Sequence, residues 1–313
     1  TLIFILLTAG VDWLWMKEMI KPILVYVSLL LLVVIDLFGV GKRYLNNEDF
    51  VSSYAIDANF NPTPADEQIL QDTDPDFKVY DVSTSPFQSA NASYLHKSLG
   101  GYHGAKLRRY QEVFERQVFK AQPNFGILNM LNTKYIITAD EKGNKIAQRN
   151  PDALGHAWFV NKYTLVPNAD AEMAALDSLK PKEEAVLDQK FAGALKGLVI
   201  QPDSSAQIKL TSYKPDELKY ESNSNAEGLA VFAEIYYNVN NEWKVTIDGK
   251  PADLLRANYI VRALRVPQGK HEIVFKFEPV SIVNGSKIDF MSSVLLIGLI
   301  VAAAVVQARK KQD

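Results

Sequence analysis

Residues 243–279, WKVTIDGKPADLLRANYIVRALRVPQGKHEIVFKFEP, have the pattern of short antiparallel strands. The opening WKVTI alternates between apolar and polar side chains, and the Asp248-Gly249 dipeptide that follows favours the two positive-φ positions of a type I′ hairpin turn. A second alternating run, residues 273–277, comes after a Pro-Gln-Gly turn. Strands that alternate with a period of two bury one face on a core, so this stretch predicts part of a β-sandwich.

The strand pattern extends back to about residue 204, and the residues before it have a mixed pattern. Regularly spaced strand signals predict an antiparallel β-sandwich over residues 196–286, and mixed signals predict an α/β or α+β domain over residues 42–195. The linker between the two is expected near residues 193–203. Within the first domain, Thr63 followed by Pro64 predicts an N-cap with proline at the first helical position. The expected helices are 63–70, 105–121 and 169–179, and the expected strands are 77–82, 134–139, 157–166, 206–212, 217–222 and 229–237.

The composition excludes several classes of protein. A net charge of -2 over 313 residues argues against nucleic acid as the main partner. The sequence has no cysteine, which removes disulfides, thiolate nucleophiles and cysteine-based metal sites. Such a chain fits a cytosolic protein or a disulfide-free bacterial envelope protein.

Two apolar runs predict transmembrane helices. Residues 22–40 are apolar apart from Ser28 and Asp36, and a second apolar run covers residues 290–306. A helix of about 20 residues crosses a hydrocarbon core of about 30 Å. We therefore predict transmembrane helices over residues 17–41 and 287–307. The hydrophobic start of the chain predicts that residues 1–16 are the end of a truncated transmembrane helix with a short cytoplasmic turn, and that the chain is the C-terminal part of a longer membrane protein.

The basic residues after the last apolar run set the expected orientation. Arg309, Lys310 and Lys311 lie in the tail 308–313, which the positive-inside rule assigns to the cytoplasm. Residues 42–286 are then expected outside the cytoplasm. Asp36 lies inside a predicted span, where a carboxyl group is costly and a functional role is one interpretation. Because it lies about one turn from the outer end, the alternative is that it reaches the membrane interface.

The strongest candidate binding segment is SYLHKSLGGYHGAKLRRY at residues 93–110. Its glycines allow a backbone to approach a ligand, and a helix expected to begin near Ala105 would direct its N-terminal amides at an anion. The alternative is a glycine-rich turn into a helix whose arginines face solvent or carboxylates. Neither GxxxxGK[ST] nor GxGxxG is present, and the two histidines of the segment do not predict a metal site. The candidate ligand-binding residues, for phosphate or glycan, are Tyr102, His103, Lys106, Arg108 and Arg109.

Two further groups of residues have competing interpretations. Asp72, Asp74 and Asp76 alternate around a proline and could hold a metal or a sugar nucleotide, but the glycine and glutamate of a calcium loop are missing, so turn chemistry is the preferred interpretation. Four aromatic residues could stack on sugars or pack in the core, and their places within strand patterns favour the core. They are Trp158, Trp243, Tyr236 and Tyr237.

Several segments resemble the C-terminal part of the YfhO-like family of bacterial multi-spanning membrane proteins. They are SLGGYHGAKLRRYQ at 98–111, LNMLNTKYII at 128–137, Trp243 with DGK at 248–250, ANY at 257–259 and PQGKHEIVFKFEP at 267–279. The resemblance implies a C-type glycosyltransferase in the bacterial inner membrane, with a periplasmic domain. It implies a polyprenyl-phosphate-linked sugar as donor and an envelope glycan or lipid as acceptor. The catalytic carboxylate of such enzymes lies in the first extracytoplasmic loop, which is expected to precede this chain, so no catalytic residue is assigned here.

Three functions remain open from the sequence. The first is a membrane glycosyltransferase that contacts the bilayer, the donor and the acceptor and needs no cofactor. The second is a non-catalytic, membrane-anchored protein of envelope assembly or carbohydrate binding. The third is a transporter or flippase, for which Asp36 is the only sign in this chain.

Overall fold

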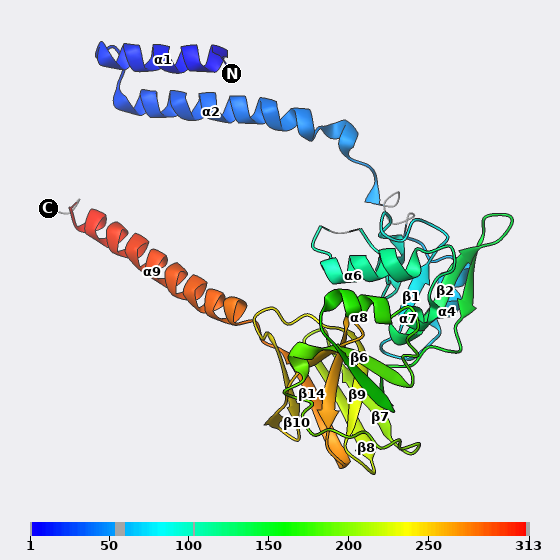
Figure 1. Cartoon of the computed structure of the whole chain (residues 1–313). Helices are drawn as coiled ribbons and strands as arrows, with labels where there is room; N and C mark the ends of the chain where they lie inside the picture. The colour runs from blue at the N-terminus through cyan, green and yellow to red at the C-terminus, as the bar shows by residue number, and fades with distance from the viewer. Residues whose placement is uncertain (1, 54–59, 103, 311–313) are drawn as a thin grey trace. The chain divides into compact units, whose positions relative to one another are not determined.

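The computed structural model describes residues 2–53, 60–102 and 104–310, with no side-chain description for residues 307, 308 and 310. The chain divides into two compact units, residues 1–61 and 62–313. In the first unit, α1 (Leu2–Met16) and α2 (Pro22–Tyr44) lie side by side as an antiparallel hairpin (Figure 1). Pro22 occupies the first turn of α2, where its missing N–H has no intrahelical partner to lose. A single turn, η1 (Asn47–Asp49), follows.

Within the described part of the chain, two helices are long and apolar enough to cross a membrane. They are the segments Pro22–Asp49 and Val280–Val306, and both leave their apolar side chains almost entirely exposed. By length and composition alone they are weak evidence of membrane association. The second helix, α9 (Val280–Lys310), begins before residue 287, the predicted start of the span, so that the segment VSIVNGSKID is helical too.

A small three-stranded sheet opens the second unit. In it β1 (Lys78–Asp81) pairs in parallel with β2 (Thr133–Ala139), and β2 pairs antiparallel with β3 (Lys145–Arg149). Helix α4 (Pro64–Leu70) packs on this sheet through Ala65 and Ile69. The predicted N-cap is confirmed, because Thr63 and Asp66 form a capping box.

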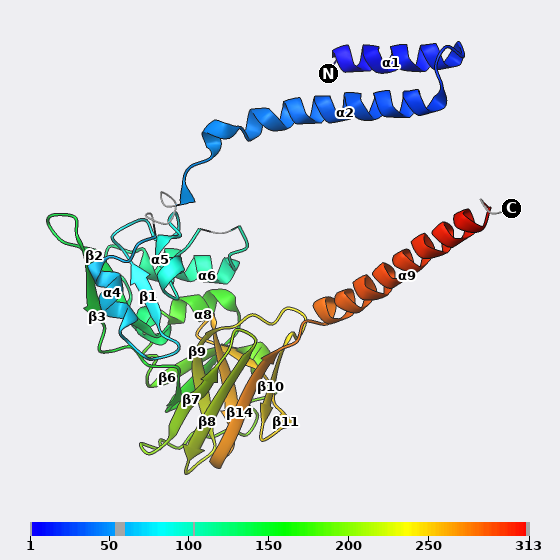
Figure 2. The same cartoon turned by 180° about the vertical axis from the view of Figure 1, so that it is seen from behind.

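Two larger sheets enclose a common apolar core. The five-stranded sheet has the order β11-β10-β14-β8-β7, visible together in Figure 2, and all its pairs are antiparallel. The six-stranded sheet has the order β4-β9-β13-β12-β6-β5 and is antiparallel except for its β5–β6 pair. Tyr220 and Phe275 of the first sheet meet Phe232 of the second edge to face. The strands are β4 (Ala157–Val160), β5 (Lys162–Val166), β6 (Glu184–Asp188), β7 (Gln207–Tyr213), β8 (Glu217–Ser224), β9 (Gly228–Ile235), β10 (Trp243–Ile247), β11 (Lys250–Pro251), β12 (Leu255–Ala257), β13 (Val261–Val266) and β14 (Gly269–Phe277).

Short helices cover the other face of the six-stranded sheet. Their apolar side chains and those of the sheet form a second core, which includes Phe114, Met130 and Leu176. The helices are α6 (Arg108–Val113), the π-helical turn η2 (Phe114–Val118), α7 (Phe125–Met130), α8 (Ala169–Ala175) and the 3-10 turn η3 (Gln189–Phe191). A further short helix, α5 (Asn91–Leu95), has no buried residue. The chain thus has apolar helices at its ends and, between them, a mixed α/β region with several sheets, one antiparallel and one curled into a half-barrel.

Two expectations about local structure have clear outcomes. The hairpin turn between β10 and β11 is confirmed, since Asp248 and Gly249 have φ of 51° and 74°. The long helix predicted over residues 105–121 is wrong in its start, because Leu107 is extended and α6 begins only at Arg108. The six-stranded sheet also draws strands from both sides of residue 196, where the sequence predicted a division between domains.

Candidate functional site

Gly100 and Gly101 allow their loop to lie directly against the backbone of Pro86. A Cβ on Gly100 would lie 2.2 Å from the carbonyl oxygen of Pro86. The next residue, Gly101, has φ of 129° and donates its N–H to the same oxygen at 2.7 Å. A side chain at residue 100 is therefore excluded by the protein's own backbone, and the two glycines position the loop that follows.

The four described members of the predicted anion-binding set do not converge on one point. Tyr102 is exposed, and His103 lies outside the described residues. Arg108 is exposed and donates to Glu112 on the same helix at 2.8 Å. Because α6 has six residues and no side-chain cap, the expected row of helix amides beside Ala105 is not formed.

Arg109 belongs to a buried polar group on the other side of α6. Its guanidinium lies 4.2 Å from the centre of the Tyr259 ring and 3.5 Å from the fully buried Glu172 carboxylate. Glu172 also accepts hydrogen bonds from Arg256 and from the backbone N–H of Tyr259. Asn258 and Tyr259 both have positive φ, and these bonds hold them in that turn. Arg109 is thus committed to contacts within the protein.

Lys106 lines a cavity of about 320 Å³ that also reaches Gly100 and Tyr110. Its ammonium lies 3.4 Å from the centre of the Phe87 ring, and no described carboxylate lies within ion-pair distance of it. Burial lowers the pKa of Lys106, and Glu115 opposes part of that shift. The cavity walls are largely apolar, formed by Leu99, Ala105, Leu107, Tyr110, Leu131, Ala233 and Ile235, with Ser98 and a second lysine, Lys78. Apolar walls with a cationic group at one side suit an amphipathic anion.

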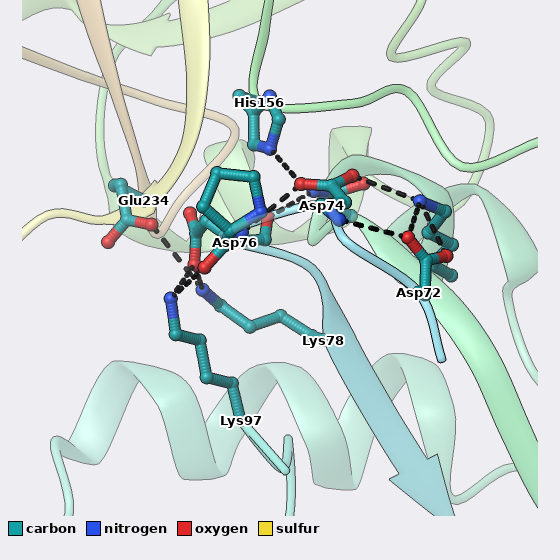
Figure 3. Close-up of polar contacts among 10 residues, drawn as sticks. Asp72, Asp74, Asp76, Lys78, Lys97, His156 and Glu234 are labelled. Carbon is teal, nitrogen blue, oxygen red and sulfur yellow. Dashed lines mark hydrogen bonds and ion pairs between the residues drawn. The ribbon is translucent and has the colours of Figure 1, made fainter. Parts of the chain in front are cut away.

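Lys78 of β1 lines the same cavity. Its side chain also belongs to a buried ionic cluster with Asp76, Lys97 and Glu234 (Figure 3). Its ammonium lies 2.8 Å from Asp76 and 3.4 Å from Glu234, and Lys97 lies 3.0 Å from Asp76. Burial lowers the pKa of Lys78, but the Glu234 and Asp76 carboxylates outweigh it, and the pKa is raised overall. Lys78 is therefore charged and neutralised within the protein.

The two carboxylates of this cluster differ in their affinity for a proton. Burial raises the pKa of Asp76, yet the two lysines more than offset this, and its pKa is below the usual range. Burial raises the pKa of Glu234, and the attraction of Lys78 does not cancel that effect. Asp76 therefore holds the negative charge, and Glu234 is the group that takes up a proton first.

The alternating aspartates N-terminal to β1 form the turns that the sequence favoured. Asp72 accepts the N–H of Asp74 at 3.0 Å, and Asp74 accepts that of Asp76 at 3.1 Å. The Asp74 oxygen that accepts the Asp76 N–H also lies 2.8 Å from His156 (Figure 3), and the second oxygens of Asp72 and Asp74 hold Lys134 at 2.8 and 3.1 Å. Among the described residues no group of three or more His, Asp or Glu side chains could hold a metal ion.

No sequence pattern predicts the partnership between Lys78 and Glu234, which lie 156 residues apart. One signal was present, a lone glutamate in the apolar run GLAVFAEI of β9. Among the aromatic candidates, Trp243 is 8% exposed and packs against Arg262 and Phe277, and Trp158 donates its indole N–H to the Pro181 carbonyl.

The chain was compared with known proteins. No family model, no curated protein and no solved structure matches it.

Proposed function

We propose that the chain is the C-terminal part of an integral membrane glycosyltransferase of the YfhO-like family, which transfers sugar from a polyprenyl-phosphate-linked donor to an envelope glycan or lipid. The two apolar helices would span the bacterial inner membrane. Residues 42–286 would lie in the periplasm as an α/β domain followed by a β-sandwich, and the C-terminus would be cytoplasmic. The catalytic carboxylate would lie in residues that precede this chain.

The cavity at Lys106 is the observation that supports this proposal most directly. A polyprenyl phosphate has an anionic head and an apolar chain, and the cavity offers an ammonium without a carboxylate partner among the described residues beside apolar walls. Its 320 Å³ would accept the phosphate and the first part of the prenyl chain. Of the five candidate residues, Lys106 carries the proposed phosphate contact, because Arg108 and Arg109 are engaged with carboxylates.

Farnesyl phosphate is a suitable probe, with farnesol as its neutral counterpart. Both would be titrated into the full chain in nanodiscs, and tight binding is expected for farnesyl phosphate only. Lys106→Gln should weaken that binding roughly tenfold or more, since a hydrogen bond to a charged group is worth about 1.5–3 kcal/mol. Lys142→Gln, at an exposed turn, is the matched control. Equal affinity for the two probes, or an unchanged affinity in Lys106→Gln, would contradict the proposed site.

The enzymatic part of the proposal needs the longer protein. Sugar transfer by the full-length protein should fall in Lys106→Gln while the melting temperature stays unchanged. If the folded full-length protein binds farnesyl phosphate but transfers no sugar, the second function, a non-catalytic protein of envelope assembly or carbohydrate binding, replaces the first.

A further inference from the structure

A second groove, with none of the lining residues of the Lys106 cavity, lies along β10. It has a volume of about 690 Å³, within the range of ligand-binding sites. Three segments form it: the turn at η3, the loop between β9 and β10, and the strands β10 and β11 with the residues that lead to β12. Its lining includes Lys190, Phe191, Asn238, Asn241, Lys244 and Asp253.

The polar groups of this groove are those that bind saccharides. Side-chain amides, a carboxylate and the Thr246 hydroxyl offer both donors and acceptors for sugar hydroxyls. Phe191 adds an apolar surface, and the nearly buried Trp243 forms a wall. The β9–β10 loop is held in place, because Asn238 accepts the backbone N–H of Trp243 at 3.0 Å.

Positive charge exceeds negative charge in the groove. Within the described part of the chain, neither Lys190 nor Lys244 forms an ion pair, and Asp253 is the single carboxylate in the lining. Arg256 lies behind the wall, 5% exposed, and pairs there with Glu172 at 3.1 Å and Asp188 at 3.8 Å. Burial lowers the pKa of Lys190 first, and Arg256 lowers it further, although the Asp188 and Glu172 carboxylates oppose part of that shift. Because no described carboxylate lies within ion-pair distance of either lysine of the lining, both ammonium groups are available to an anion.

We propose that this groove binds an acidic saccharide, with Lys190 and Lys244 contacting its carboxylate or phosphate groups and the amides of the β9–β10 loop contacting its hydroxyls. The binding does not depend on the proposed transferase activity. If that activity is present, the groove would hold the acceptor glycan.

The connection to α9 agrees with such a ligand. Trp243 pairs with Phe277, and the N–H of Glu278 donates to the carbonyl of Glu242 at 2.8 Å, two residues before α9 begins at Val280. The groove is therefore built on the segment that leads into the apolar helix. Ten helical residues, about 15 Å, separate Val280 from the strongly apolar part of α9. An envelope glycan at the membrane surface would lie within reach.

The test uses trigalacturonic acid as the acidic probe and cellotriose as the neutral one. Both would be titrated into the full chain in nanodiscs and followed by calorimetry. Trigalacturonic acid should bind at least about tenfold more tightly than cellotriose, and the double variant Lys190→Gln/Lys244→Gln should lose about tenfold or more of that affinity. The control is Lys182→Gln/Lys209→Gln, two lysines of a different groove of 490 Å³, which should change the affinity less than about twofold.

Three outcomes would overturn the proposal. The first is no binding of trigalacturonic acid at millimolar concentration. The second is an equal loss of affinity in both double variants, which would show that only net charge matters. The third is that the chain binds vesicles containing phosphatidylglycerol but no saccharide, and that the Lys190→Gln/Lys244→Gln variant loses the vesicle binding. The groove would then be a lipid-headgroup site. Because Lys106 is unchanged in these variants, their farnesyl phosphate binding reports on the other cavity separately.

Discussion

The contrast between Asp76 and Glu234 provides a sharp test of the ionic cluster. Asp76 is 2% exposed and accepts from both Lys78 and Lys97. Asp76→Asn leaves the buried Lys78 ammonium with Glu234 alone, at 3.4 Å. Removing one partner of a buried ion pair costs about 3–5 kcal/mol, and since Glu234 remains we expect the lower end, about 3 kcal/mol. The Lys97 pair adds little because Lys97 is partly exposed.

Glu234→Gln should behave differently. Its carbonyl oxygen can still accept from Lys78, and the substitution removes a buried negative charge that the protein holds at some cost, as the raised pKa of Glu234 indicates. We expect the free energy of unfolding to change by less than about 1 kcal/mol at neutral pH. The two substitutions alter adjacent carboxylates in the same cluster, so each is the control for the other.

The pH dependence follows from the directions of the two pKa shifts. The pKa of Asp76 is below 3.8, so its contribution to stability is present above that pH and is lost as the pH falls through the folded-state value. The pKa of Glu234 is above 4.5, so its contribution is present below pH 4.5 and is lost as the pH rises through the folded-state value. The stability of Glu234→Gln relative to the unsubstituted chain should therefore increase above pH 4.5.

The assay is thermal unfolding of the full chain in detergent, followed by circular dichroism between pH 3 and 8. For a region of this size about 1 kcal/mol shifts the midpoint by about 2–4 °C, so Asp76→Asn should lower it by about 6–12 °C at pH 7. Glu234→Gln should change it by less than about 4 °C. A larger loss in Glu234→Gln than in Asp76→Asn would refute the assignment of the charge to Asp76.

Two further substitutions test the local structure. Gly100→Ala should lower the free energy of unfolding by about 2–4 kcal/mol, because the new Cβ meets the Pro86 carbonyl at 2.2 Å and disturbs the hydrogen bond from Gly101. Gly104→Ala should be close to neutral, because among the described residues beyond its chain neighbours no atom lies within 4 Å of the new Cβ. Equal effects of the two substitutions in urea titrations would contradict the packing role of Gly100. Thr63→Ala should cost about 1 kcal/mol through loss of the capping box, and Thr63→Ser should restore most of it, with denaturant midpoints as the measure.

Short-range features of this fold could be predicted from the sequence. The capping box at Thr63 and the turn at Asp248-Gly249 depend on neighbouring residues, and the chemistry of those residues decides the backbone conformation. The start of α6 was predicted three residues too early, because the glycine-rich turn was expected to lead directly into a helix at Ala105, whereas Leu107 is extended. Periodicity reports which face is buried and says little about where a helix begins.

Long-range features could not be predicted. The six-stranded sheet pairs β4 with β9, some seventy residues apart, and the sequence indicates each strand but not its neighbour. The same holds for the cluster, where Asp76, Lys78 and Glu234 come from a turn and two different sheets. The sequence predicted five candidate anion-binding residues without ranking them. Only the fold distinguishes Lys106, which lines a cavity, from Arg108 and Arg109, which pair with carboxylates.

The charges around the Lys106 cavity also determine which end of it could accept an anion. Lys78 lies at one side, but Asp76 is ionised next to it, and a phosphate there would face an existing negative charge. Lys106 lies over an aromatic ring with no described carboxylate in ion-pair distance, so the attraction of its ammonium for an anion is less opposed. Successive side chains of β9 point to opposite faces of the sheet. Ala233 and Ile235 therefore line the cavity, while Glu234, between them, belongs to the ionic cluster. An amphipathic anion would therefore bind with its charged group at Lys106 and its apolar chain along Leu131 and Ile235.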